Sequence, residues 1–217
     1  MESVSSTFRN LSPEKQERVL AAAMGEFSDK GYQKASVNVM VSASGIAKGS
    51  IYQYFKDKKS LFLYVFDFAI SMVRRTLLAV KEETRDQDFF VRLEKSLLAG
   101  VDFIHRHPRV YNLYLKILFD QHVPRRQELL QAVRRFAAEY LGSLVRQGQA
   151  RGELRADLSP AAVVFLLDAL LDRFLQAVAV PYFDVSLNLD QAGPAEMQGR
   201  VGELVGLLRD GLASRER

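Results

Sequence analysis

The stretch SVNVMVSASGIAKGSIYQYFKDKKS, residues 36–60, decides the fold of this chain. It contains two short helical patterns, which we predict at 37–44 and 47–56, and Gly45 lies between them. Glycine takes the positive φ of a tight turn without strain, so Gly45 suits the connection. Two helices joined by a short glycine-containing turn form a helix-turn-helix motif, whose second helix enters the major groove of DNA. The stretch therefore predicts a DNA-binding segment.

The two sides of the second predicted helix differ in character. At about 100° per residue, the side expected to pack inward carries Ala47, Ile51, Tyr54 and Phe55. The opposite side carries Gly49, Tyr52, Gln53 and Lys56, with Lys48 and Ser50 on the flanks. An amide, a phenol, a missing side chain and cations suit a DNA groove. The alternative is a solvated helix in an ordinary bundle, which the glycine turn and the basic character of the region disfavour.

Each residue type on this outer side suggests a role. Gln53 can make paired hydrogen bonds to adenine, whereas Lys48, Tyr52 and Lys56 are suited to phosphates. Ser36 precedes the first helix of the pair, whose free N–H groups suit a phosphate. The full set expected to contact DNA is Ser36, Lys48, Gly49, Ser50, Tyr52, Gln53, Tyr54, Lys56 and Lys58.

The charge of the chain is concentrated near this motif. The 217 residues include 30 Lys and Arg against 26 Asp and Glu, a formal net charge of +4. Residues 30–60 hold Lys30, Lys34, Lys48, Lys56, Lys58 and Lys59 against Asp57 alone. A concentrated basic patch is the electrostatic footprint of a nucleic-acid-binding protein, although charge alone would equally fit a solvated surface.

Composition excludes several other classes. The chain has no cysteine, which rules out disulfides, thiolate zinc sites and cysteine nucleophiles. Its first ten residues lack the apolar core of a signal peptide, and charges interrupt its most apolar run, 161–180. We therefore expect no membrane contact and a cytoplasmic protein. His105 and His107 stand two apart and point in different directions on a helix, so we expect no metal site and no cofactor.

Helical periodicity continues along the whole chain, and no stretch shows the alternation of a strand. Residues 1–10 are expected to be frayed, and a helix begins at Pro13, after Ser12, and ends at Gly31. Further helices are predicted at 58–83, 88–106, 109–119, 125–149, 160–180 and 194–213, with a loop at 182–193. The fold class is therefore all-α.

Three segments of the sequence resemble one known family. ERVLAAAMGEF (17–27), SVNVMVSASGIAKGSIYQYF (36–55) and KDKKSLFLYVF (56–66) are similar to the N-terminal domain of the tetracycline-repressor-like (TetR) transcriptional regulators. Three features depart from that pattern. The family often has Ser at position 47 and usually Tyr at position 53, and an acidic residue and a small Ala are common where this chain has Asn38, Met40 and Val41. These departures leave the fold intact and concern the operator sequence.

The resemblance implies an organisation and a function. It implies a three-helix DNA-binding domain, residues 1–57, and a helical ligand-binding and dimerisation domain, residues 58–217. It also implies a homodimer on double-stranded DNA with a near-palindromic operator, and repression that an unidentified small-molecule effector relieves. The two recognition helices would then meet half-sites ~34–36 Å apart.

The last two predicted helices are the candidates for the dimer interface. The helix at 160–180 is apolar on nearly all sides, and a helix buried all round needs cover on both sides. The resemblance implies a four-helix interface with the symmetry mates, through Val164, Leu167, Leu171, Val201, Leu204, Val205 and Leu208. The alternative is that these helices complete the core of a monomer.

A ligand pocket in the C-terminal part would be mostly apolar with few polar anchors. The candidate lining residues are Phe66, Phe103, Tyr111, Tyr114, Phe165, Asp168 and Phe174. Aromatic residues at helical spacing also suit a plain core. Asp168 would either anchor a cationic or hydroxylated ligand, or pair with Arg173 or with an arginine across the dimer interface.

Three function classes follow from the sequence. The leading hypothesis is a ligand-responsive homodimeric repressor of transcription. The second is a DNA-binding regulator or activator with no small-molecule gating. The third is an enzyme on a helical bundle, but no phosphate loop, paired-histidine motif or nucleophile elbow appears, so we expect no catalytic residues.

Overall fold

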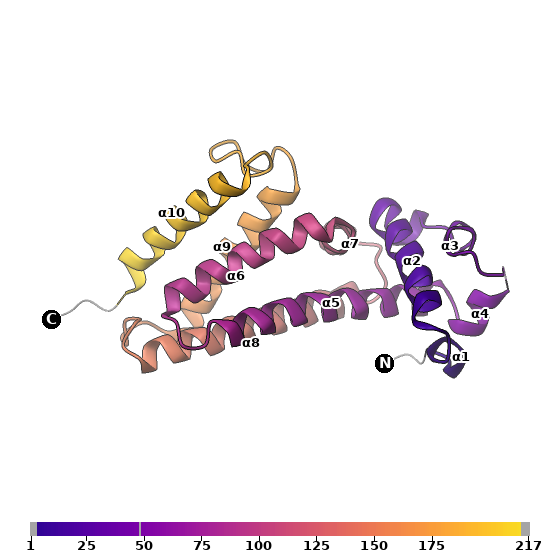
Figure 1. Ribbon diagram of the computed structural model, residues 1–217, viewed down its shortest axis with the longest axis horizontal. Coiled ribbons are helices and arrows are strands. Elements are labelled where there is room, and N and C mark those ends of the chain that lie inside the picture. Colours follow the sequence, from indigo (N-terminus) through magenta and orange to yellow (C-terminus); the bar gives the residue numbers. More distant parts are fainter. Residues whose placement is uncertain (1–3, 48, 214–217) are drawn as a thin grey trace. The chain divides into compact units, whose positions relative to one another are not determined.

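A computed structural model describes residues 4–47 and 49–213, and these residues form ten helices and no strand. The helices are α1 (Ser6–Arg9), α2 (Pro13–Lys34), α3 (Val37–Ser44), α4 (Ser50–Tyr54), α5 (Lys58–Glu83), α6 (Phe89–Arg106), α7 (Pro108–Phe119), α8 (Arg126–Ala150), α9 (Pro160–Ala179) and α10 (Pro194–Leu212) (Figure 1). The predicted all-α fold is confirmed. None of these helices has the length and apolar character needed to cross a membrane.

The chain divides into two compact units. The first takes the residues up to Met72 together with His107–Gln131, and the second takes Val73–Arg106 together with the residues from Ala132 onward. The division falls inside α5, so the two units share a continuous helix rather than a linker. The boundary predicted after Asp57 lies within the first unit and stays a prediction.

The first unit is built on α2, against which both α3 and α7 pack. Ser12 caps α2 by accepting a hydrogen bond from Lys15 N–H at 3.4 Å, and Pro13 follows at the first helical position, as predicted. Aromatic rings fill the interior: the Phe27 and Phe62 centroids lie 5.0 Å apart in an edge-to-face arrangement. Phe27 and Phe62 are almost fully buried, so this contact fixes α5 against α2.

The N-terminal segment differs from the prediction. Residues 1–10 were expected to be frayed, but Ser6–Arg9 form the short helix α1, and Phe8 within it is completely buried. Ser5 caps this helix through its hydroxyl, which accepts from Phe8 N–H at 3.3 Å. The prediction rested on the mostly polar composition of residues 1–10. It gave no weight to the single aromatic residue, Phe8, whose burial against other parts of the chain orders the segment.

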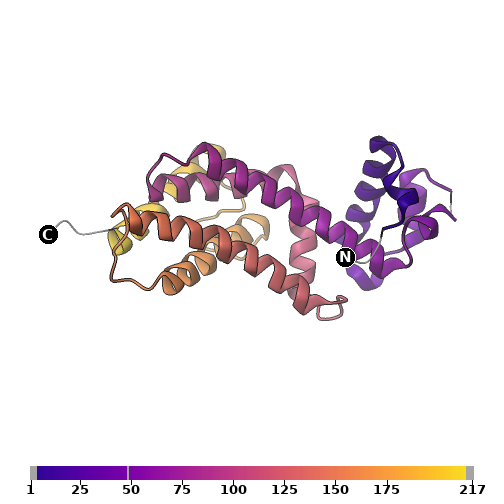
Figure 2. The same cartoon turned by 90° about the horizontal axis from the view of Figure 1, so that it is seen from below.

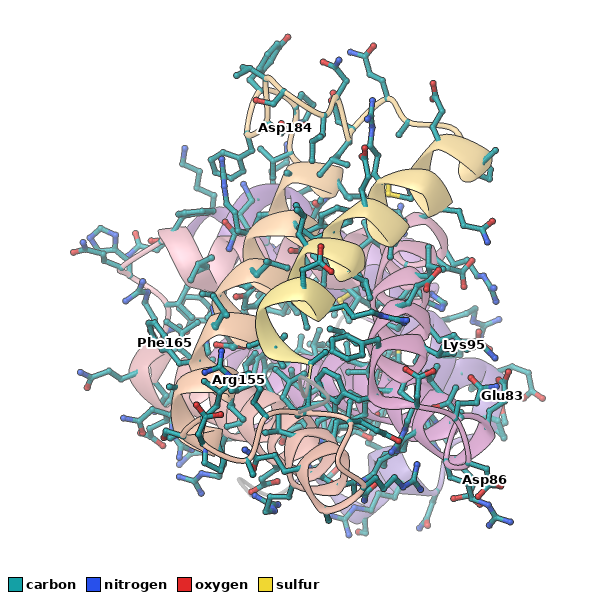
Figure 3. All side chains as sticks on the ribbon, turned by 90° about the vertical axis from the view of Figure 1, so that its left-hand side faces the viewer. Glu83, Asp86, Lys95, Arg155, Phe165 and Asp184 are labelled. Carbon is teal, nitrogen blue, oxygen red and sulfur yellow. The ribbon has the colours of Figure 1, made fainter. Side chains whose placement is uncertain are left out.

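The second unit packs α6 against both α9 and α10. Two glycines permit close contact: a Cβ at Gly100 would lie 3.2 Å from Leu175, and one at Gly148 would lie 3.1 Å from Leu154. The Tyr140 and Ser96 hydroxyls share a buried hydrogen bond of 2.7 Å, and burial raises the pKa of Tyr140. Figures 2 and 3 follow this unit from two further directions.

The segment between α9 and α10 is a loop, as predicted. The Asp184 carboxylate organises it by accepting hydrogen bonds from the N–H groups of Ser186, Leu187 and Leu189 at 2.8, 3.0 and 3.1 Å (Figure 3). These backbone bonds lower the pKa of Asp184. The side chains of Tyr182 and Val185 are almost fully exposed here.

Candidate DNA-binding site

The turn between α3 and α4 has the geometry that the sequence predicts. Gly45 ends α3 in the left-handed conformation, with φ 67° and ψ 26°. Apart from Gly45 and its two chain neighbours, no described residue has an atom within 4 Å of the Cβ that a larger residue would add, so space is not the constraint. The positive φ is the constraint, because it costs any side chain with a Cβ.

The helix after this turn is shorter than predicted. We expected 47–56, but α4 covers only Ser50–Tyr54, and Ala47 is exposed rather than packed inward. Ser50 N–H, at the start of α4, donates to the Ala47 carbonyl at 2.9 Å, so Ala47 lies just before the helix rather than within it. Gly49 is the N-cap of α4, and glycine favours a helix interior least among residues other than proline.

The two faces of α4 separate as the periodicity predicts from Ser50 onward. Ile51 and Tyr54 are buried, whereas Tyr52 is 61% exposed and Gln53 is also exposed. Lys56 and Gly49 are exposed, and Ser50 is half-buried. Lys48 lies outside the described residues. The structure thus leaves a phenol and an amide exposed on α4 and an ammonium group exposed just after it.

Tyr54 carries two predictions, inward packing and contact with DNA. Its side chain is only 8% exposed and its ring lies 5.7 Å from that of Phe8. Inward packing is confirmed, and contact between Tyr54 and DNA stays a prediction.

The start of α3 is held by α2. Glu26 Oε1 accepts a hydrogen bond from Ser36 N–H at 2.9 Å. The Ser36 hydroxyl caps no N–H of α3, so the first turn of this helix has no side-chain cap from its own N-cap residue. A helix start with uncapped N–H groups suits an anionic oxygen, in keeping with the predicted phosphate contact at Ser36.

Lys58 has an intramolecular role that sequence reasoning missed. Its Nζ donates to the Gln33 carbonyl at 3.0 Å and lies 5.0 Å from the centre of the Tyr32 ring. Burial lowers the pKa of this amine. Lys58 therefore ties the start of α5 to the end of α2, and its contact with DNA stays a prediction.

Asp57 explains how α5 begins with two lysines. Lysine at a helix N-terminus opposes the helix dipole, but the Asp57 carboxylate accepts hydrogen bonds from the Ser60 N–H at 2.7 Å and the Ser60 hydroxyl at 2.6 Å. These two bonds lower the pKa of Asp57. Asp57 is therefore the N-cap of α5, at the point where the chain leaves the α4 region.

Replacing Asp57 by alanine should lower the free energy of unfolding by about 1 kcal/mol at pH 7, the usual value of an N-cap. The folded-state pKa is depressed, so this contribution is present above the unfolded pKa of about 3.9 and is lost as pH falls through the lower folded value. Urea denaturation at pH 7 and at pH 3 measures it. Asp57→Asn is the control, since asparagine caps equally well without titrating. Equal stability of wild type and Asp57→Ala at pH 7 would refute the capping role.

The residues predicted for a ligand pocket are spread over both units. Phe66, Tyr111 and Tyr114 belong to the first unit, and Phe103, Asp168 and Phe174 to the second. Phe66, Phe103 and Phe174 are buried, and Tyr111 and Tyr114 are half-buried. Phe165 corrects the prediction, because it is 76% exposed and points away from the helices rather than into an interior (Figure 3).

Asp168 has a partner other than those predicted. It pairs with Arg134 on α8 at 3.3 Å, and the same guanidinium binds Asp172 at 2.6 Å. Arg173 instead lies 4.8 Å from the centre of the Phe183 ring. Because Arg134 is 34 residues away in sequence, only the packing of α8 on α9 reveals the pair.

The predicted dimer residues are mostly turned toward the interior of the second unit. Leu167, Val201, Val205 and Leu208 are buried, and Val164, Leu171 and Leu204 are half-buried. The large apolar side chains that α9 and α10 expose are others: Phe165, Leu166 at 45% and Leu207 at 72%. Helical periodicity predicts which residues of α9 and α10 share a face. It does not predict which of these faces packs against other helices of the same chain.

Two family models match the chain. The model described as bacterial regulatory proteins, tetR family, matches residues 19–65, which include the turn and α4. The model described as tetracyclin repressor-like, C-terminal domain, matches residues 117–181.

Several curated proteins are similar in sequence. The HTH-type transcriptional regulator YerO of Bacillus subtilis is 26% identical over 118 residues, 54% of this chain and 40% of that one. The probable acrEF/envCD operon repressor of Escherichia coli K12 is 24% identical over 164 residues, 74% of each chain. The HTH-type transcriptional activator FasR of Mycolicibacterium smegmatis is 30% identical over 104 residues, 46% of this chain and 45% of that one.

Solved structures share the fold over most of the chain. A TetR family transcriptional regulator from Chloroflexus aurantiacus is 28% identical with a TM-score of 0.72, covering 98% of this chain and 99% of that one. FadR of Bacillus subtilis, solved in complex with stearoyl-CoA, has a TM-score of 0.69 at 16% identity, covering 87% and 96%. With its helix-turn-helix geometry and both matched models, the chain belongs to the TetR family of DNA-binding transcriptional regulators.

Proposed function

We propose that this protein is a homodimeric repressor that binds a near-palindromic operator and leaves it when a small-molecule ligand binds the C-terminal helical part. The observation that carries the proposal is the exposed part of the α4 region, where Tyr52 is 61% exposed beside the exposed Gln53 on α4 and the exposed Lys56 follows the helix. Glutamine suits paired hydrogen bonds to adenine, and lysine and tyrosine suit phosphates.

Exposed apolar side chains on α9 and α10 support dimerisation. Phe165, Leu166 and Leu207 are large and open to solvent, which is costly unless a partner covers them. The Cβ positions of Gly202 and Gly206 on α10 meet no described atom within 4 Å, so the backbone there is open to a close neighbour. A second copy of the chain is the partner that we propose for this surface.

The proposal that a ligand controls DNA binding is supported by a ligand bound to a protein of the same fold. FadR of Bacillus subtilis holds stearoyl-CoA on the same fold, which supports a small-molecule effector for this chain as well. Such an effector releases DNA only if it binds the DNA-incompetent conformation more tightly than the competent one. Buried Phe103 and Phe174 are the pocket residues that we propose in the second unit.

An activator is the second candidate, because FasR is an activator and is 30% identical over 104 residues. A reporter gene placed behind an operator that the protein selects from a random pool of DNA duplexes separates repression from activation. Repression predicts that deleting the regulator raises expression, and activation predicts that deletion lowers it.

A panel of metabolites that includes fatty acyl-CoAs tests the gating. A true effector should raise the melting temperature of the free protein and also release the operator in fluorescence anisotropy, since it stabilises the native state by about 2.7 kcal/mol at a hundred times its Kd. Compounds that shift melting without releasing DNA are the internal control. If no compound does both, the ungated regulator is the correct alternative.

A further inference from the structure

The helix α1 lies before the residues that the DNA-binding family model matches. The family model begins at residue 19, whereas α1 covers Ser6–Arg9. Phe8 is nevertheless among the large side chains that are fully buried, and α1 contacts α4 (Figure 1). A segment that precedes the matched residues therefore contacts α4, the helix proposed above to bind DNA.

Phe8 contacts both the end of α4 and the start of α5. Its ring lies 5.7 Å from that of Tyr54, 4.9 Å from that of Phe55 and 5.5 Å from that of Tyr64. Phe55 is the residue that ends α4 and is itself 2% exposed. Aromatic groups of this kind hold one another in defined tilted or edge-to-face orientations.

A backbone hydrogen bond joins the same two segments. Ser5 N–H donates to the Tyr54 carbonyl at 3.2 Å, which satisfies one of the carbonyl groups that a helix end leaves without an intrahelical partner. The other end of α1 is fixed to α2, because Gln16 Nε2 donates to the Arg9 and Leu11 carbonyls at 3.1 and 3.0 Å.

The recognition helix depends on such outside contacts. It has five residues, and its N-cap Gly49 provides no side-chain hydrogen bond. Helices much shorter than about 12 residues are unstable alone, so neighbouring elements decide where α4 lies. Phe8 and Ser5 supply contacts at its C-terminal end, through the Tyr54 and Phe55 rings and the Tyr54 carbonyl.

We propose that α1 positions the recognition helix, with the Phe8 ring and the Ser5 N–H fixing the end of α4 and thereby setting how well the protein discriminates its operator from other DNA. Phe8 acts through Tyr54 and Phe55 and is a positioning residue. This inference rests on DNA recognition by α4, as proposed above.

The test compares full-length variants on the selected operator and on scrambled DNA. Phe8→Ala should reduce the ratio of operator to scrambled affinity by about 10- to 100-fold, the size of one lost paired base contact. Affinity for scrambled DNA at low salt should stay near wild type, because the exposed lysines remain. Phe8→Leu should restore most of the ratio.

A matched pair separates the hydrogen bond from the ring. Ser5 has φ −62°, which proline can adopt, so Ser5→Pro removes the N–H that binds Tyr54, whereas Ser5→Ala removes only the capping hydroxyl. Ser5→Pro should lower the ratio more than Ser5→Ala. Phe89→Ala removes an equally buried ring from the second unit and should leave the ratio of the folded protein unchanged.

Hydrogen exchange tests the same idea without DNA. The Phe55 amide, which donates to the Ile51 carbonyl at 2.8 Å, should exchange faster in Phe8→Ala, while amides of α6 keep wild-type rates. An unchanged ratio in Phe8→Ala, or an equal fall in Phe89→Ala, overturns the proposal. If wild type selects no operator, the proposed function fails, and the Phe55 exchange rate alone decides the role of α1.

Discussion

Replacing Leu207 by glutamate should dissociate the proposed dimer into monomers. Leu207 is 72% exposed in one chain, and burying a leucine is worth about 1.5–3 kcal/mol. Symmetry counts the loss twice, so the dimer should weaken by a factor on the order of 10² to 10⁴. Sedimentation velocity measures the association directly. Operator affinity should fall with it, because two linked recognition helices bind more tightly than one.

Leu78→Glu is the matched control. Leu78 on α5 is 53% exposed, so its replacement by glutamate is the same chemical change at an exposed position outside α9 and α10. It should leave both the dimer and the operator affinity intact. A Leu207→Glu protein that remains dimeric, or a Leu78→Glu protein that dissociates, would assign the interface to another surface.

Replacing Gln53 by alanine should relax base preference at one position of each half-site. A lost pair of hydrogen bonds to adenine costs about 1–3 kcal/mol of discrimination. Lys56→Ala should behave differently. It should lower the affinity for all DNA sequences alike, and it should reduce the slope of log affinity against log salt concentration by about 1 per lost phosphate contact. Binding to a set of single-base operator variants, repeated at several salt concentrations, measures both effects.

The two substitutions serve as each other's controls, since Gln53 and Lys56 are both exposed in the α4 region. Base-dependent loss for Gln53→Ala with uniform loss for Lys56→Ala supports the division of roles. If the two variants give parallel profiles across the operator set, Gln53 does not read a base.

Local sequence patterns predicted most of the helices. The bounds of α3 and α5 agree with the predictions 37–44 and 58–83, because caps, glycine and apolar periodicity all act within a few residues. The helix α1 was missed because its formation depends on a buried contact of Phe8 with residues more than forty positions away. Composition carries no signal of such a contact.

The sequence predicted which residues of the α4 region are exposed, but it did not predict the intramolecular partners of the charged side chains. Tyr52 and Gln53 are exposed as expected, since one turn of helix separates faces by simple geometry. The Lys58 ammonium group donates a hydrogen bond to the Gln33 carbonyl, and the Asp168 carboxylate pairs with Arg134. Only tertiary packing brings these partners together. The same holds for α9, whose exposed Phe165 is an apolar residue like Val163 and Leu167, which are buried on the same helix.

Selection of bound duplexes from a random pool by the wild-type chain is the most direct test of operator recognition by a dimer. We predict an enriched near-palindrome whose half-sites lie ~34–36 Å apart centre to centre, with an adenine position that loses enrichment when Gln53 is replaced by alanine. Enrichment of a single unrepeated site, or of no sequence at all, would contradict recognition by two copies of α4.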